Sequence, residues 1–315
     1  MARVRLLSGL FLLFSISVFC QITNDKTIYL DSLWNETTQG EHTYYRVIKE
    51  YSRQKPYYKV YDFYKSGALQ MEGNSLLKDF LVQEGECVYY YENGTKKTVE
   101  NYQNFMLHGN YSSWYENGNK KIEGQYITDS DEVFTQLKIN QFWDKDNRQK
   151  VTDGYGDYEI DDQCESVSGK IRNGFREGVW RGTNKIYKYT FVEVYDNGKL
   201  ISGNSTDAQN ADHHYLTVDQ SAVPEKGVKS FSKFISKNFK LSNDADRKGG
   251  IIVTRVTIGS DGKLIDFKVI KDIGFNSAEE ITRLFTKKDL WIPAESRGIK
   301  IPVTYSIPIR IFPSR

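Results

Sequence analysis

The feature that most constrains this chain is a short phrase of aromatic residues, a turn and a glycine, which recurs along its first two thirds. The most complete copy is Gly109–Tyr126, in which Trp114 and Tyr115 precede Asn117-Gly118 and a polar return run. Asn-Gly between two strand-like runs is a strong hairpin signal, because a type I′ turn needs positive φ at both central residues. Repeats of this kind indicate an array of units that pack on their neighbours, which favours a binding surface over a catalytic cleft.

Further copies extend the array from about residue 57 to residue 203, with a degraded copy at Phe142–Asn147. Glycine supplies positive φ in the turns or leaves room where backbones pass closely, and the aromatic residues cover the sheet. The aromatic residues and turn glycines that define the repeats are Tyr64, Gly67, Tyr91, Gly94, Trp114, Tyr115, Gly118, Trp180, Tyr195 and Gly198.

The composition changes after the repeats. The Ser/Asp/Asn-rich segment 204–227 is expected to be a linker. Apolar residues at helical spacing then predict a helix over Val228–Leu241. The β-branched runs Ile251–Ile258 and Leu264–Ile270, which flank a Gly-Ser-Asp-Gly turn, predict a hairpin.

Two more elements complete this C-terminal domain, 228–315. Ser277, with Glu280 three residues later, predicts a capping box at the start of a second helix. Strict alternation of apolar and other residues over 301–311 predicts a final strand. The expected fold is a mainly β N-terminal region, built as an antiparallel hairpin repeat array, plus a small α+β C-terminal domain in the order helix-strand-strand-helix-strand.

The N-terminus predicts export. A basic start, the apolar run Leu6–Phe19 and the polar sequence from Gln21 are typical of a cleaved secretory signal over residues 1–20. The run is shorter than the roughly 20 apolar residues that a membrane span needs. Lipidation at Cys20 is an alternative. Residues 21–56 carry no repeat and are expected to cap the first edge of the array, since an unpaired edge invites aggregation.

The sequence contains little evidence of a catalytic or metal-binding site. With 43 basic and 41 acidic residues, the chain has no charge excess for nucleic acid. It has no nucleophile elbow, phosphate loop or zinc spacing, so we expect no enzyme, cofactor, metal or small-molecule substrate. His213-His214 lacks a third ligand at a recognisable spacing, and the acidic run 144–162 lacks the calcium-loop pattern. After export, Cys87 and Cys164 either pair or remain free thiols.

The repeated phrase Gly-x-Tyr/Trp-x-x-Tyr-Glu-Asn-Gly resembles the bacterial variant of the MORN repeat, which also occurs in antitoxin-like components. The resemblance covers roughly residues 57–203. It implies binding of a protein or a surface, and it brings no catalytic residues.

The C-terminal domain resembles the TonB C-terminal domain over about 228–313. The residues that carry this resemblance are Gly250, Asp261, Gly262, Trp291, Pro293, Pro308, Ile309 and Ile311, whereas Leu241-Ser242 stands where that family has Tyr-Pro. The resemblance implies binding of a short receptor segment by strand addition to the last strand. The implied partner-binding residues are Val303, Thr304, Tyr305, Ser306, Ile307 and Arg310. Pro302 and Pro308 fall on one side of that strand, which marks an outer edge and weakens it for docking.

Together these observations predict a non-enzymatic adaptor, exported to the periplasm or the outer membrane, that binds a protein of the cell envelope such as an outer-membrane receptor. An energy transducer of the TonB type, which serves transport through such receptors, is the alternative. It conflicts with the expected cleavage of residues 1–20 and with the absence of a Pro-rich spacer. An immunity or antitoxin-like binder is a weaker alternative that follows from the repeats alone.

Overall fold

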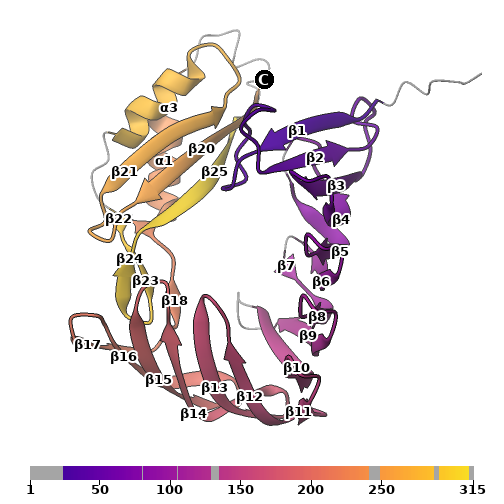
Figure 1. The fold of residues 1–315 in the computed structure, drawn as a ribbon. Coiled ribbons are helices and arrows are strands. Elements are labelled where there is room, and N and C mark those ends of the chain that lie inside the picture. The colour runs from indigo at the N-terminus through magenta and orange to yellow at the C-terminus, as the bar shows by residue number, and fades with distance from the viewer. Residues whose placement is uncertain are drawn as a thin grey trace, which may run out of the picture.

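The computed structural model describes residues 24–79, 81–104, 106–128, 135–240, 249–286 and 291–311. The expected secretory signal, Cys20 and Leu241-Ser242 lie outside these residues. The fold is mainly β, with a long antiparallel hairpin sheet and a small C-terminal α+β region (Figure 1). The fold class expected from the sequence is therefore confirmed.

The N-terminal sheet is a meander in which strands that follow each other along the chain pair antiparallel. The exception is the short β7, because β7 and β8 both pair with β6. Its strands are β1 (Lys26–Leu30), β2 (Tyr44–Ile48), β3 (Tyr58–Tyr64), β4 (Leu69–Ser75), β5 (Gln83–Tyr90), β6 (Lys96–Gln103), β7 (Met106–Leu107), β8 (Gly109–Trp114), β9 (Lys120–Thr128), β10 (Thr135–Trp143), β11 (Gln149–Thr152), β12 (Tyr155–Asp161), β13 (Glu165–Arg172), β14 (Phe175–Asn184), β15 (Tyr189–Asp196), β16 (Lys199–Thr206) and β17 (Asp212–Tyr215). The sheet thus begins inside the expected cap and ends inside the expected linker.

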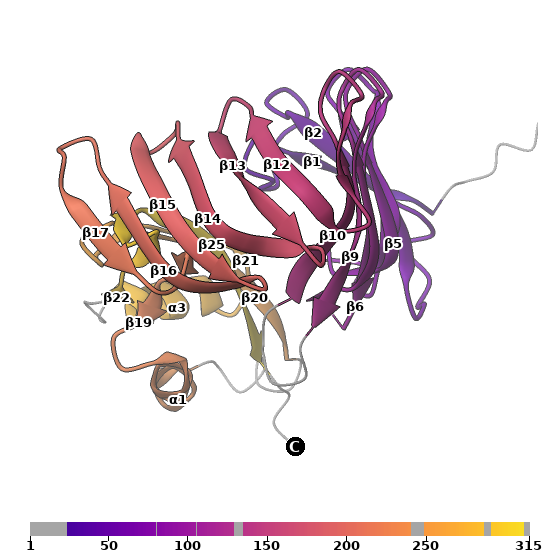
Figure 2. The same cartoon turned by 90° about the horizontal axis from the view of Figure 1, so that it is seen from below.

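The sheet bends at β10. Figure 2 shows β12 to β17 running to one side of the stacked strands β1 to β10. A β-bulge between Ile139 and Gln141 interrupts the pairing of β10 with β9. The residues around the bulge bond elsewhere, since the Ile139 amide donates to Gly174 O (2.8 Å) and Asn140 O accepts from the Gly154 amide (2.8 Å). The turns that contain Gly154 and Gly174 therefore lie against β10 and fix the bend.

The core of the array lies at this bend. On β15, buried residues alternate with exposed ones, which places Tyr189, Phe191, Glu193 and Tyr195 on the covered face. The main cluster joins these rings to Phe142 on β10 and Trp180 on β14, as well as to Ile122, Ile139, Val151, Tyr158, Val167 and Ile171. A Cβ at Gly169, Gly182 or Gly203 would overlap Trp180, Phe191 or Tyr215 respectively. All three glycines make room for rings, and Gly182 also makes room for the main chain, since a Cβ there would overlap Ser166 O.

The Asn-Gly turns are of two kinds. At Asn197-Gly198 both residues have positive φ, as a type I′ turn requires. At Asn117-Gly118 only the glycine does, so the expected type I′ turn is wrong there. The Gly118 amide donates to Tyr115 O, which closes a longer loop with a left-handed glycine at its end. The reason is local: Asn117 Oδ1 accepts from the Asn119 amide (3.0 Å), which favours helical φ at Asn117.

The C-terminal domain has the expected order helix-strand-strand-helix-strand, with short strands added. Its elements are α1 (Val228–Asn238), β20 (Gly250–Ile258), β21 (Leu264–Lys271), α3 (Ser277–Thr286), β22 (Trp291–Ile292), β23 (Ala294–Ser296), β24 (Ile299–Ile301) and β25 (Val303–Ile311). The main sheet has the order β21-β20-β25. Its core contains Ile252 and Val256 of β20 and Ile281, Leu284 and Phe285 of α3, with Phe231 and Phe234 of α1 packed against them.

Two local expectations need correction. Ser277 is the first residue of α3, and its hydroxyl accepts from the Ile273 amide, so the capping box with Glu280 does not form. Glu280 binds Arg283 instead (2.6 Å). The segment 204–227 is no irregular connection, because besides β17 it contains β18 (Asp219–Gln220) and β19 (Val223–Pro224), which pair with β23 and β22.

The first strands of the array return to the C-terminal domain, as Figure 1 shows. Lys271 Nζ on β21 lies 3.8 Å from the carboxylate of Asp79, and both side chains are partly exposed. A hollow of about 200 Å³ at this contact is lined by Leu77 on the array side and by Ile251 and Val253 on β20. The C-terminal domain therefore contacts both ends of the array.

Candidate functional site

The predicted binding strand, β25, lies at the edge of its sheet. It pairs with β20 over Val303–Ile311, and among the described residues no strand pairs with its other side. Figure 1 shows β25 on the side of the sheet that faces the array. Its side chains alternate, so that Tyr305 and Ile307 pack on the core while Thr304, Ser306 and Arg310 are exposed.

The prolines show which main-chain groups face outward. Pro308 is opposite Val253 in the register, and a proline has no N–H to donate to β20. In an antiparallel pair, residues alternate between bonding the neighbouring strand and facing away from it. Consistent with this, Thr254 Oγ1 donates to Ile307 O (3.3 Å), one residue before the proline. We infer that Thr304, Ser306 and Arg310 offer their N–H groups to the open edge.

The early repeat residues build a row of stacked turns, here called the turn stack: Tyr64–Gly67, Tyr91–Gly94, Tyr115–Gly118 and Asp144–Asn147. The tyrosine hydroxyl of each turn donates to the carbonyl oxygen just before the next turn. The acceptors are Tyr90 O for Tyr64 (2.8 Å), Trp114 O for Tyr91 (3.0 Å) and Trp143 O for Tyr115 (2.9 Å). The recurring tyrosines are therefore structural links between repeats.

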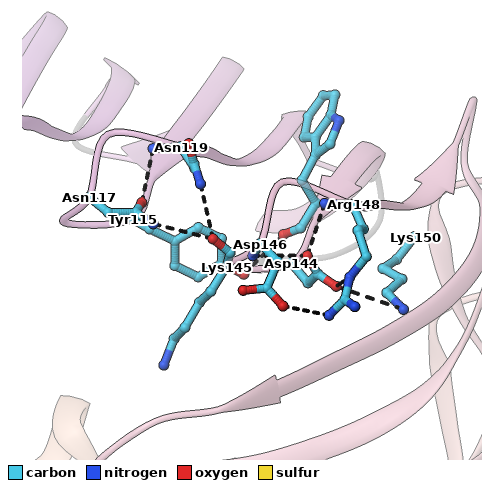
Figure 3. A network of polar contacts seen from close by, with 9 residues as sticks. Tyr115, Asn117, Asn119, Asp144, Lys145, Asp146, Arg148 and Lys150 are labelled. Atoms are coloured by element: carbon cyan, nitrogen blue, oxygen red, sulfur yellow. Dashed lines mark hydrogen bonds and ion pairs between the residues drawn. The ribbon is translucent and has the colours of Figure 1, made fainter.

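The asparagine of the phrase makes a second link in the same stack. Asn93 Nδ2 donates to Glu116 O (3.0 Å), and Asn117 Nδ2 donates to Lys145 O (3.2 Å). Figure 3 shows the last step, where Tyr115, Asn117 and Asn119 reach the loop that carries Asp144 and Lys145. Asp144 replaces the tyrosine there and instead binds Arg148 (2.8 Å), so this form of link stops at the degraded copy.

The late repeat residues have another role. Trp180 is fully buried, and Tyr195 is 7 % exposed, so both belong to the core of the bend. Gly198 has φ 82° in its turn, and its carbonyl oxygen accepts from Gln136 Nε2 (2.9 Å) of β10. The structure thus separates the sequence-predicted aromatic residues into a turn stack and a core.

A buried ion pair that was not predicted from the sequence joins the array to the C-terminal domain. Glu193 on β15 is 0 % exposed, and its Oε1 accepts from Arg297 Nε (2.8 Å) and from the Tyr215 hydroxyl (2.9 Å). Its Oε2 accepts from the Tyr195 hydroxyl (3.0 Å). Burial and then the Glu193 carboxylate raise the pKa of Tyr215, so that this hydroxyl remains a donor.

Arg297 lies in the turn between β23 and β24 and is 7 % exposed. Its guanidinium stacks 3.7 Å from the ring centre of Phe191. Its carbonyl oxygen accepts from Ser205 Oγ (2.7 Å), and the neighbouring Ser296 hydroxyl bonds Tyr189 (3.0 Å). Burial lowers the pKa of Arg297, but the Glu193 carboxylate and the Tyr189 hydroxyl together raise it by more, so the guanidinium stays charged. We call this contact the Glu193–Arg297 junction.

The other candidate residues are used locally. His213 Nε2 lies 2.9 Å from Asp207, and among the described residues no three His, Cys, Asp or Glu side chains gather as a metal site would require. Within the acidic run, Asp144 and Asp146 bind Arg148, and Asp157, Asp161 and Asp162 bind lysines or cap their own turns. Cys87 is a buried free thiol and Cys164 an exposed one, so no bridge joins them.

Two polar hollows lie on the array, and the sequence predicted neither. One, of about 450 Å³, lies over β12 to β16 and includes Arg181, Thr190 and Asn204. The other, of about 680 Å³, lies at the bend beside Asn140 and Tyr155. Both volumes are within the range of small-molecule sites, about 300–1,000 Å³.

Among the described residues, no helix is both long and apolar enough to cross a membrane. No known protein family, curated protein or solved structure matches this chain.

Proposed function

We propose that this protein is a non-enzymatic adaptor of the cell envelope that takes up an extended segment of a partner protein along the open edge of β25. The observation that carries the proposal is that this nine-residue strand pairs with β20 on one side only, among the described residues. Strand addition at such an edge gives affinity through main-chain hydrogen bonds. The export signal predicted over residues 1–20 supports an envelope partner, with an outer-membrane receptor as the first class to test.

The array supports this proposal as a frame with a second surface. The turn stack links its early strands, and the Glu193–Arg297 junction connects its late strands to the domain that carries β25. On the outer face of β14 to β16, Val179, Val194 and Ile201 are exposed. Apolar side chains gathered on a surface mark protein contacts more often than chance. An adaptor requires two such surfaces.

The test removes one hydrogen-bond donor from the open edge. Ser306→Pro deletes an outward N–H and leaves the pairing with β20 intact, because Tyr305 before it is already extended. Ser306→Ala is the matched control, since it changes the side chain and keeps the N–H. A photo-crosslinking amino acid at Arg310 in each full-length variant, expressed in the native host, reports which proteins lie beside the edge.

We expect the control to crosslink to an extended segment of an envelope protein and Ser306→Pro to lose that product. Both variants should keep the melting temperature of the parent. Equal crosslinking of the two variants, or crosslinks that map only to folded surfaces of the captured protein, would contradict strand addition at β25.

A further inference from the structure

The larger hollow of the array lies where the sheet bends, and we call it the bend hollow. Six of the residues that line it carry the argument: Asn110 and Ser112 of β8, Lys138 and Asn140 of β10, Asp153 in the turn before β12, and Tyr155 at the start of β12. Chain segments more than forty residues apart along the sequence therefore contribute to one concavity of about 680 Å³.

The walls of the bend hollow are fixed by main-chain contacts. The Gly174 amide donates to Gly154 O (2.9 Å), so the two turns that lie on β10 also bond each other. A Cβ at Gly154 would lie 2.7 Å from the Gly174 amide nitrogen, so only glycine fits between them. The residues just before these glycines, Asp153 and Asn173, are thereby held at the rim. Such a site is formed before any ligand arrives, which favours affinity.

Part of the polar lining is oriented by its own hydrogen bonds. Gln141 Nε2 donates to Asp153 Oδ1 (3.0 Å), and Gln141 Oε1 accepts from Gln149 Nε2 (2.6 Å). The Tyr155 hydroxyl donates to Asn173 Oδ1, which holds a ring that is 55 % exposed. The ring thus presents an apolar face at a set angle.

The rest of the lining has hydrogen-bonding capacity to spare. The side chains of Asn110, Ser112, Lys138 and Asn140 form no hydrogen bond or ion pair with any residue that the structure describes. Together they offer amide, hydroxyl and ammonium groups, that is, donors and acceptors side by side. A ligand that satisfies them must itself be rich in groups that both donate and accept.

The charges of the lining narrow the class of ligand. The lining has one ammonium, from Lys138, and two carboxylates, from Glu123 and Asp153, so it has no positive excess to attract an anion. The aromatic side chains of the lining are Tyr111 and Tyr155, and these two rings offer too little apolar surface for a hydrophobic ligand. A neutral polyhydroxylated molecule fits both conditions.

We propose that the bend hollow binds a short neutral oligosaccharide. Adjacent sugar hydroxyls pair with the planar amides of Asn110 and Asn140 and with the carboxylate of Asp153, each of which can make two hydrogen bonds at once. The apolar C–H face of a sugar ring lies on the electron-rich face of Tyr155. This binding is independent of β25 and of the proposed strand addition.

The experiment titrates the full chain with soluble trisaccharides (of N-acetylglucosamine, of β-linked glucose and of α-linked glucose) and, separately, with inorganic phosphate. Calorimetry and ligand-observed NMR measure the binding. The variants are Tyr155→Ala and Asn140→Ala. Tyr187→Ala is the matched control, because Tyr187 is also an exposed tyrosine (42 %) and lies outside the hollow.

We expect one trisaccharide class to bind with one site per chain, and each of the two hollow variants to weaken this binding about tenfold or more. Tyr187→Ala and Ser306→Pro should bind like the parent, the latter because it affects strand addition alone. Asn140→Ala loses no described hydrogen bond of its side chain, so it should keep the parental melting temperature. No binding of any trisaccharide, binding of phosphate in their place, or equal loss in Tyr187→Ala would each overturn the proposal.

Discussion

Replacing Glu193 by alanine is expected to open the contact between the array and the C-terminal domain. The change removes a fully buried carboxylate and leaves the guanidinium of Arg297, itself 7 % exposed, without its partner at 2.8 Å. The Tyr195 and Tyr215 hydroxyls lose their acceptor at the same time. Removing one member of a buried ion pair typically costs about 3–5 kcal/mol, because the other charge stays desolvated.

The assay is amide hydrogen exchange on the full chain, followed by mass spectrometry of the peptides that cover β23 and β24. Exchange of protected amides reports the free energy of local opening. A tenfold change in an equilibrium constant corresponds to about 1.4 kcal/mol, so a loss of about 3–5 kcal/mol makes exchange in these peptides roughly 100-fold to 4,000-fold faster. Peptides of the turn stack, which lies elsewhere in the array, should exchange as in the parent.

Two further variants make the reasoning refutable. Adding Arg297→Ala to Glu193→Ala removes the buried one of the two guanidinium groups that Glu193 pairs with, the other being that of Arg176, which is 33 % exposed. The double variant should therefore lose less free energy of unfolding than the sum of the two single variants, by about 0.5–3 kcal/mol. Asp157→Ala breaks the exposed ion pair with Lys170 (2.9 Å) and should change stability by less than about 1 kcal/mol. Strictly additive effects of the first two changes, or unaltered exchange in Glu193→Ala, would refute the importance assigned to the junction.

Three other predictions concern the array. Tyr115→Phe should lower the free energy of unfolding by about 1 kcal/mol in urea titrations; because burial raises the pKa of this hydroxyl to about 12, the difference from the parent should be present below pH 10, then fall to zero and change sign as pH rises from 10 to 12. An iodoacetamide time course at pH 8 should modify Cys164 and spare Cys87 in the folded chain, since Cys87 is fully buried and burial raises the pKa of its thiol to about 11; equal rates would contradict its burial. Gly203→Ala should destabilise the chain by about 1–3 kcal/mol because the new methyl overlaps a ring on β17, whereas Gly40→Ala, with nothing within 4 Å, serves as the control in the same thermal melts.

The sequence predicted what depends on short-range patterns. The hairpin at Gly109–Tyr126, the two C-terminal helices and the alternating last strand all follow from local periodicity, and the structure has them. The prediction of a type I′ turn at Asn117 was wrong, because two hydrogen bonds of the Asn117 side chain override the usual preference of Asn-Gly for that turn. Local rules identify such a loop better than they identify its geometry.

Long-range pairings were beyond the sequence. Glu193 shares its buried face with Tyr189, Phe191 and Tyr195, and a charge in that register was a signal that a partner must exist. Nothing local names the partner, which lies 104 positions further along the chain. The bend hollow was missed for the same reason, since its lining comes together only after a bulge at Asn140 turns the sheet.

The contact of Lys271 with Asp79 has a consequence for how firmly the first strands of the array hold the C-terminal domain. Because Lys271 and Asp79 belong to one chain, the array and the C-terminal domain are tethered, and their effective concentration for each other is on the order of millimolar. A partly exposed ion pair of this kind contributes less than about 1 kcal/mol and is screened by salt. The first strands of the array are therefore only weakly held against the sheet that carries β25, and raising the ionic strength should make their separation easier.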